Sequence, residues 1–198
     1  MVTKKLYVEG GGDGKSLKTQ CRRGFRKFLE RAGLAGKMPA IVACGGRNGA
    51  LKDFRRALAA GDCQPFLLVD AEAPVVVPYA QPWAHLENRD GWGRPEGATD
   101  EQCHLMVQVM ESWFLADPQE LADYYGQGFN LGALPKNPDI EAVAKEDVFQ
   151  GLEQATRATK KRGYSKGDHS FSIAEHLDPG LVMAKSRYAK RLVEELGK

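Results

Sequence analysis

Residues 6–16, LYVEGGGDGKS, decide the fold class of this chain. The apolar run at 6–8 stops at a cluster of glycines, a pattern that predicts a short buried strand and a tight turn. From Ser16 onward apolar residues recur every three or four positions, which predicts a helix with one apolar face that ends near Gly33. The apolar positions of this helix are Leu17, Cys21, Phe25, Phe28, Leu29 and Ala32.

The same alternation continues along the next part of the chain. Residues 40–43 (AIVA) and 66–69 (FLLV) are two further apolar runs, and residues 51–58 between them show helical spacing. Strands that alternate with helices in this way predict βαβ units and a parallel sheet covered by helices. We therefore expect an α/β protein with a three-layer, Rossmann-like sheet that binds ligands at the carboxyl ends of its strands.

The remainder of the chain is expected to be a loop, one more strand and then helices. Residues 71–104 contain four prolines and predict a long irregular segment. Residues 105–110 predict a fourth buried strand, and Pro118 after Asp117 predicts the start of a helix over 119–125. Further helices are expected at 140–145, 148–161, 170–177 and 187–196.

This pattern gives an expected division of the chain into two parts. Residues 1–125 form the metal-binding α/β domain, and residues 126–198 form a helical C-terminal extension packed on the same body. The glycine-rich segment at 126–132 is the boundary between them.

The formal net charge of +2 hides a strong asymmetry. Residues 1–60 carry 14 Lys and Arg against 4 Asp and Glu, residues 61–156 carry 4 against 17, and residues 157–198 carry 10 against 5. Basic ends around an acidic middle suit a protein that attracts a polyanion and concentrates carboxylates elsewhere. Ordinary solvated helix faces would give the same counts.

The cellular location is predicted from the absence of membrane-span and signal-peptide patterns in the sequence. No apolar run reaches the ~18 residues of a membrane span, and residues 1–11 (MVTKKLYVEGG) have no apolar core of a signal peptide. The four cysteines show no paired spacing, so we expect reduced thiols rather than a zinc site or disulfides. We expect a cytoplasmic protein with no membrane partner.

Carboxylates follow two of the predicted strands. Glu9 comes directly after the first strand, and Asp70 and Glu72 come after the third. Residues two apart in extended backbone point the same way, so Asp70 and Glu72 could chelate one ion. Mg²⁺ takes oxygen ligands and keeps several waters, so two or three carboxylates suffice. A site for Mg²⁺ or Mn²⁺ that acts on phosphoryl groups is predicted here.

At this point the chain resembles a known fold family. Residues 8–13 (VEGGGD) are similar to the E-G-x-x-[ED] element that opens Toprim domains, and residues 70–72 (DAE) are similar to their D-x-D element. Residues 104–117 (HLMVQVMESWFLAD) are more specific. With WAHL at 83–86, RDGW at 89–92, LPKNP at 134–138 and YSK at 164–166, they resemble domain-of-unknown-function family 4276 over nearly the whole chain.

The resemblance implies roles for the carboxylates. Glu9 would be a general acid/base and would help to hold the metal, and Asp70 and Glu72 would be metal ligands. Glu72 departs from the Toprim D-x-D element, which has aspartate at this position. The resemblance also implies a Mg²⁺- or Mn²⁺-dependent nuclease that cleaves DNA or RNA, acts in defence against phage, and works with a separately encoded ATPase. A homodimer is left open.

Other residues are weaker candidates for the site. Glu111 and Asp13 are candidate catalytic groups, and Asp117 is a candidate metal ligand, although a helix cap would explain Asp117 equally. A solvated helix face would explain Glu111, and turn chemistry would explain Asp13. The candidate phosphate-binding cations are Lys15, Arg47 and Lys166 in glycine-containing loops and Arg22, Arg23 and Arg26 on the first helix. His169 is a candidate for proton transfer, whereas His85 is expected to be packed.

Two rival functions remain open at this point. Residues 10–16 (GGGDGKS) end like the G-K-S of a phosphate-binding loop, but the glycine expected at the start of that motif is Glu9, whose carboxylate would face the phosphates. ATP binding would support that alternative. The second rival is a non-catalytic subunit that binds nucleic acid or a partner through its basic helices.

Overall fold

Four strands form one parallel sheet in the computed structural model, which describes residues 3–198. The strands are β1 (Lys4–Val8), β2 (Ala40–Ala43), β3 (Gln64–Asp70) and β4 (Cys103–Met106), in the order β2-β1-β3-β4. Leu6 of β1 lies opposite Ile41 of β2 and Phe66 of β3. Because every pair is parallel, the carboxyl ends of all four strands meet at one edge of the sheet.

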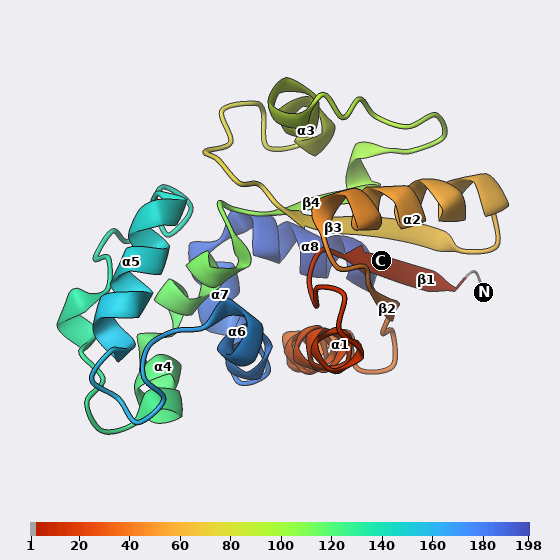
Figure 1. Ribbon diagram of the computed structural model, residues 1–198. Coiled ribbons are helices and arrows are strands. Elements are labelled where there is room, and N and C mark those ends of the chain that lie inside the picture. Colours follow the sequence, from red (N-terminus) through yellow and green to blue (C-terminus); the bar gives the residue numbers. More distant parts are fainter. Residues whose placement is uncertain (1–2) are drawn as a thin grey trace.

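Helices connect the strands and continue beyond the sheet. The α-helices are α1 (Lys15–Leu29), α2 (Arg47–Ala60), α3 (Pro82–Asp90), α4 (Pro118–Tyr125), α5 (Lys145–Thr156), α6 (Lys166–Ala174), α7 (Pro179–Lys185) and α8 (Arg187–Gly197). The short π or 3-10 segments are η1 (Glu30–Leu34), η2 (Asp100–Gln102), η3 (Met110–Ala116) and η4 (Leu131–Ala133). In Figure 1 the carboxyl edge of the sheet faces α5 and α6.

Each face of the sheet contributes side chains to a separate hydrophobic core. Alternate residues of a strand point to opposite faces, so Leu6 and Val8 enter one core and Tyr7 enters the other. The first core lies between the sheet and α1 and continues to the C-terminal helices. The second core is covered by α2 and α3 (Figure 1). The predicted α/β class with a parallel sheet between helical layers is therefore confirmed.

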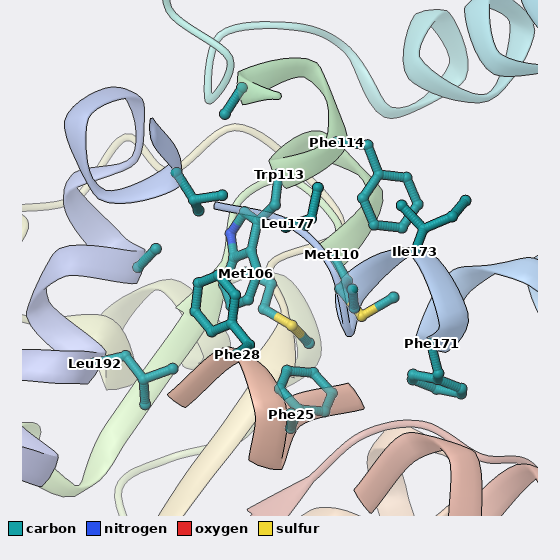
Figure 2. Packing of buried hydrophobic residues seen from close by; sticks show 14 of the residues in the cluster. Phe25, Phe28, Met106, Met110, Trp113, Phe114, Phe171, Ile173, Leu177 and Leu192 are labelled. Atoms are coloured by element: carbon teal, nitrogen blue, oxygen red, sulfur yellow. The ribbon is translucent and has the colours of Figure 1, made fainter. Parts of the chain in front are cut away.

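Aromatic residues join the sheet's first core to distant segments (Figure 2). Trp113 of η3 stacks on Phe28 of α1 with ring centroids 5.0 Å apart, and Phe25 meets the same indole edge-on at 6.3 Å. Phe171 of α6 and Leu192 of α8 belong to this core as well. The helices after residue 125 are therefore packed on the same apolar cluster as α1. The expected domain boundary at residues 125–126 stays a prediction.

Three local expectations were wrong. Residues 71–104 were expected to be irregular, but Pro82 begins helix α3, where its missing N–H costs nothing, and Gly91 ends it in a left-handed conformation. The fourth strand ends at Met106 instead of residue 110, and η3 follows. Residues 140–145 do not form a helix before Lys145, because Asn137 and Asp139 side chains accept hydrogen bonds from the N–H groups two residues ahead.

The two ends of the described chain lie near each other. The Lys4 ammonium at the start of β1 donates to the carbonyl of Leu196 at 2.8 Å, and Lys37 donates to the carbonyl of Gly197 at 2.9 Å. In Figure 1 the N-terminal end lies on the side of the sheet away from its carboxyl edge, and the C-terminal end of α8 lies beside β1. Among residues 3–198, no helix has the length and apolar character needed to cross a membrane.

Candidate metal centre

Three carboxylates meet at the carboxyl edge of the two central strands. Glu9 follows β1, and its backbone N–H donates to Leu68 of β3 at 2.9 Å. Its carboxylate Oε2 accepts the N–H of Asp70 at 3.0 Å, so the two strand ends are joined through a side chain. One carboxylate oxygen from each of Glu9, Asp70 and Glu72 lies within 4.8 Å of the others. The predicted convergence of these three residues is confirmed.

Glu72 reaches this cluster by a different route from the one expected. Strand β3 ends at Asp70, and Glu72 has a left-handed backbone with φ of 64°, so the extended-strand explanation for its direction was wrong. Its N–H donates to the carbonyl of Gln108 at 2.7 Å, which fixes the turn. A non-glycine residue at positive φ costs about 1 kcal/mol or more, and such strain is concentrated at functional sites.

Asp70 is the most enclosed member of the triad, with 3% of its surface exposed. Its Oδ1 accepts the N–H of Met110 at 2.8 Å, which orients the carboxylate. Burial, with help from the nearby charges of Glu9 and Glu111, raises the pKa of Asp70 to about 8. Burial likewise raises the pKa of Glu9 above its ordinary value, although Arg47 opposes this.

Cations surround the triad and come from several parts of the chain. Arg47, the first residue of α2, lies 3.6 Å from Glu9 Oε2, donates to the carbonyl of Asp70 and rests on the ring of Trp92 at 4.9 Å. Lys145, the first residue of α5, donates to Glu72. Burial opposes ionisation of Glu72, but the Lys145 hydrogen bond and charge lower its pKa overall.

A fourth carboxylate lies behind Asp70. Glu111 of η3 is fully buried, and its Oε1 accepts a hydrogen bond from the Tyr164 hydroxyl at 2.7 Å. Lys166, at the start of α6, places its Nζ 3.5 Å from Asp70 Oδ2 and 3.8 Å from Glu111 Oε2. Burial would lower the pKa of Lys166, but the carboxylates around it, Asp70 first, raise it.

A cavity of about 290 Å³ opens beside the triad. Glycine turns after β1 and β2 form one wall, and Gly10 and Gly45 exchange backbone hydrogen bonds of 2.7 and 2.9 Å. Gly45 has a φ of 81°, and a Cβ on it would lie 2.9 Å from the carbonyl oxygen of Gly12, so this close approach requires glycine. Met110, Phe171 and Lys166 also line the cavity, and the first two belong to the hydrophobic cluster drawn in Figure 2.

The glycine turn differs from a nucleotide-binding loop in two respects. The N–H of Gly10, which a phosphate cradle would use, is already bonded to Gly45. Lys15 begins α1 and is exposed, and it is not among the residues that line the cavity. Glu9, which occupies the position of the first glycine of a phosphate-binding loop, lines the cavity instead.

Several other sequence candidates lie outside the cluster. Asp117 caps α4 through Oδ1, which accepts the N–H of Glu120 at 3.2 Å, and its Oδ2 accepts the N–H of Asp178 at 2.9 Å. The cap that the sequence left open is thus the observed role of Asp117, and the structure does not bring it to the triad. Asp13 is exposed in the glycine turn and does not line the cavity.

The three arginines of α1 are also remote from the triad. Arg22, Arg23 and Arg26 line a groove with Thr3 and Ala40, which stand at the amino ends of β1 and β2. This is the opposite edge of the sheet from Glu9 and Asp70. Arg23 pairs with Glu175 at 2.7 Å and Arg26 with Glu30 at 2.8 Å.

The two histidine candidates have packing roles. His85 is buried, and its Nε2 lies 2.9 Å from the carbonyl of Ala71, as expected of a packed histidine. His169 lies among tyrosine rings, and its Nδ1 is 3.0 Å from the Tyr125 hydroxyl. Burial lowers the pKa of His169, and His169 does not line the cavity beside the triad.

Sequence reasoning assigned no role to four residues that contact the clustered carboxylates or the cations paired with them. Lys145 and Arg89 pair with Glu72, the latter at 3.9 Å, Asp90 pairs with Arg47 at 2.5 Å, and Tyr164 holds Glu111. Arg89, Asp90 and Tyr164 belong to the motifs that resemble a known family, which is the signal that could have singled them out. Lys145 belongs to none of these motifs, and its pairing with Glu72 depends on how α5 packs beside the carboxyl edge of the sheet.

Comparison with known proteins gives one match. A family model described as "Domain of unknown function (DUF4276)" matches residues 8–197. No curated protein and no solved structure matches the chain. The matched span includes all four clustered carboxylates and Lys166.

Proposed function

The chain belongs to the DUF4276 family, and we propose that it is a Mg²⁺- or Mn²⁺-dependent hydrolase of phosphodiester bonds in DNA or RNA, with a Toprim-like site. The observation that carries this proposal is the convergence of Glu9, Asp70 and Glu72 within 4.8 Å at the carboxyl ends of parallel strands. Three oxygen donors with nearby space for waters suit a hard cation that keeps part of its hydration shell.

The chemistry of the donor set fits such an ion. The three residues offer only carboxylate oxygens, and hydrogen bonds from Asp70 and Met110 N–H groups fix Glu9 and Asp70 in orientation. When bound, the ion would stabilise charge on a transferring phosphoryl group and would activate water. Its binding would also favour the ionised form of Asp70 over the proton that burial favours.

Residues of the chain would provide the remaining steps. Glu9 lines the cavity, and burial raises its pKa above the ordinary value, so its carboxylate is the candidate general base or acid. Lys166 lines the cavity, where its ammonium would attract the phosphate. The glycines that line the cavity have no side chains, which would let a phosphodiester approach the triad closely.

Metal binding and cleavage test the proposal separately. Calorimetric titration with Mn²⁺ should give binding that disappears in Asp70→Asn and persists in Asp123→Asn, a matched change of an exposed acid on α4. Cleavage of labelled DNA and RNA should require Mg²⁺ or Mn²⁺ and vanish in Glu9→Gln, while nucleic-acid binding survives. A chain that binds no divalent ion would contradict the proposal.

The same assays separate the rival functions. Nucleic-acid binding without metal-dependent cleavage, in the presence and absence of an ATPase encoded nearby, would favour a non-catalytic subunit. Micromolar ATP affinity that Lys15→Ala abolishes would favour a nucleotide-binding loop. Cleavage that appears only with the ATPase would support the partnership and the defence role that the Toprim resemblance implies.

A further inference from the structure

The ammonium of Lys166 bridges two buried carboxylates that come from different elements. Its Nζ lies 3.5 Å from Oδ2 of Asp70, the last residue of β3, and 3.8 Å from Oε2 of Glu111 in η3. The two acids are 3% and 0% exposed. Two ionised carboxylates placed this close in a poorly solvated site repel each other strongly, so a cation between them is required for both to be charged.

Glu111 has one oxygen that no hydrogen bond satisfies within residues 3–198. Its Oε1 accepts from the Tyr164 hydroxyl at 2.7 Å and from Ser170 Oγ at 3.4 Å. Its Oε2 is buried and has no hydrogen-bond donor, and Lys166 at 3.8 Å is the cation beside it. A buried, orphaned carboxylate oxygen is costly unless a positive charge compensates it.

Lys166 is not buried like a structural ion-pair partner. Its side chain is 55% exposed and lines the cavity beside the triad, whereas both acids it contacts are enclosed. The ammonium therefore enters the acidic cluster from the cavity side, which is the side from which a solvated metal ion would also enter. Its position is that of a cation held by Asp70 and Glu111 together.

Asp70 is thus shared by two adjacent cation positions. One is bounded by Glu9, Asp70 and Glu72, and the other by Asp70 and Glu111. In sites that hold two divalent ions about 3.5–4 Å apart, both ions stabilise the transferring phosphoryl group. We propose that the Lys166 ammonium permanently occupies the second of these positions in place of a second divalent ion, so that each chain binds one. This inference rests on the proposed function.

The stoichiometry of Mn²⁺ binding tests this assignment on the full chain. We expect calorimetry to count one ion per wild-type chain and two per Lys166→Met chain, because the substitution vacates the position beside Glu111. The double variant Lys166→Met/Glu111→Gln should return to one ion. Electron paramagnetic resonance should show the broadened signal of neighbouring Mn²⁺ ions in Lys166→Met alone.

A matched lysine controls for the general loss of positive charge. Lys145 pairs with Glu72 of the triad and does not contact Glu111 within hydrogen-bond or ion-pair distance. Lys145→Met should therefore tighten Mn²⁺ binding and leave the stoichiometry at one. Circular dichroism and thermal melting confirm folding of each variant, and Lys166→Gln provides a second, polar replacement.

The outcomes separate this inference from the proposed function. Two ions in the wild type, or one ion in both Lys166→Met and Lys166→Gln, would overturn the role of Lys166 and leave the metal function standing. No ion in any variant would overturn the metal function as well. A second ion that also appears in Lys145→Met would contradict the assignment to the position beside Glu111.

Discussion

The carboxyl edge of the sheet and the outer face of α1 both carry several charged side chains, but the surroundings of these charges differ. At the carboxyl edge, the triad is paired with cations from α2, α5 and α6, and Asp70 is almost fully enclosed. On α1 the arginines are exposed, and Arg26 pairs with Glu30 four residues along the same chain segment at 2.8 Å.

The difference lies in what removal of one charge leaves behind. An exposed pair on a helix contributes at most ~0.5 kcal/mol, since water replaces the lost partner. Removal of a cation from a buried network leaves its carboxylates without compensation, which costs about 3–5 kcal/mol. A count of Lys and Arg treats Arg22 and Arg47 as equivalent, whereas their surroundings show that Arg47 is part of the site.

The largest expected effect is loss of metal binding in Asp70→Asn. Loss of a residue that only supports a metal ligand lowers affinity about 10–100-fold, so loss of a direct ligand should lower Mn²⁺ affinity at least ~100-fold. The amide is neutral, so the fold should persist and the metal-free protein should melt at a higher temperature than wild type at pH 8. Titration calorimetry and thermal melts measure the two effects.

The next effect concerns the contact that joins the two regions. Gly24 on the inner face of α1 packs against α6, and a Cβ there would lie 2.7 Å from the backbone oxygen of Phe171. Gly24→Ala should lower the free energy of unfolding by about 1–3 kcal/mol through overpacking. Gly167→Ala on α6 meets no atom within 4 Å and should be neutral or slightly stabilising. Equal effects in urea unfolding would contradict the close contact.

An effect that is smaller per pH unit should appear in the pH dependence of stability without metal. The pKa of Asp70 rises from 3.8 to about 8 on folding, so the folded state binds the extra proton between these values. Its contribution is complete below pH 4 and is lost as pH rises to about 8, by at most about 1.4 kcal/mol per pH unit. Asp70→Asn should flatten this slope, and an unchanged slope would mean that another group causes it.

The smallest effect on the site is expected from α1. Replacing Arg22, Arg23 and Arg26 together with Ala should change stability by less than about 1 kcal/mol and leave Mn²⁺ affinity unchanged. If these residues hold phosphates, affinity for all sequences should fall alike, and the salt slope should drop by ~0.9 per lost duplex contact. Filter binding across a salt series measures both the affinity and the salt slope. Weaker metal binding in this variant would show that the two regions are coupled.

Much of the fold could be predicted because its signals are local. The apolar runs of β1 and β3 and the periodic apolar face of α1 are each contained in one short stretch of sequence. The positions of Glu9 and Asp70 at the carboxyl edge follow from where β1 and β3 end. Helix α3 was missed although Pro82 and Gly91 mark its two ends, because the surrounding prolines suggested a loop.

The rest of the site depends on distant parts of the chain. Glu72 enters the cluster through a left-handed turn fixed by the carbonyl of Gln108, which no alternation of side chains reveals. Glu111 was a candidate, but its burial behind Asp70 and its bond to Tyr164 depend on how η3 and the later helices pack together. Pairings between residues more than fifty positions apart leave no periodic trace in a single sequence.

The neighbouring ends of the chain have a practical consequence. Lys4 is bonded to Leu196, so a tag or fluorescent label fused at either end would emerge from the same side of the molecule. The amino end of β1, where Lys4 lies, is opposite the carboxyl edge that holds Glu9 and Asp70. A chain attached to a sensor surface by either end would therefore present the carboxyl edge and its triad toward the solution.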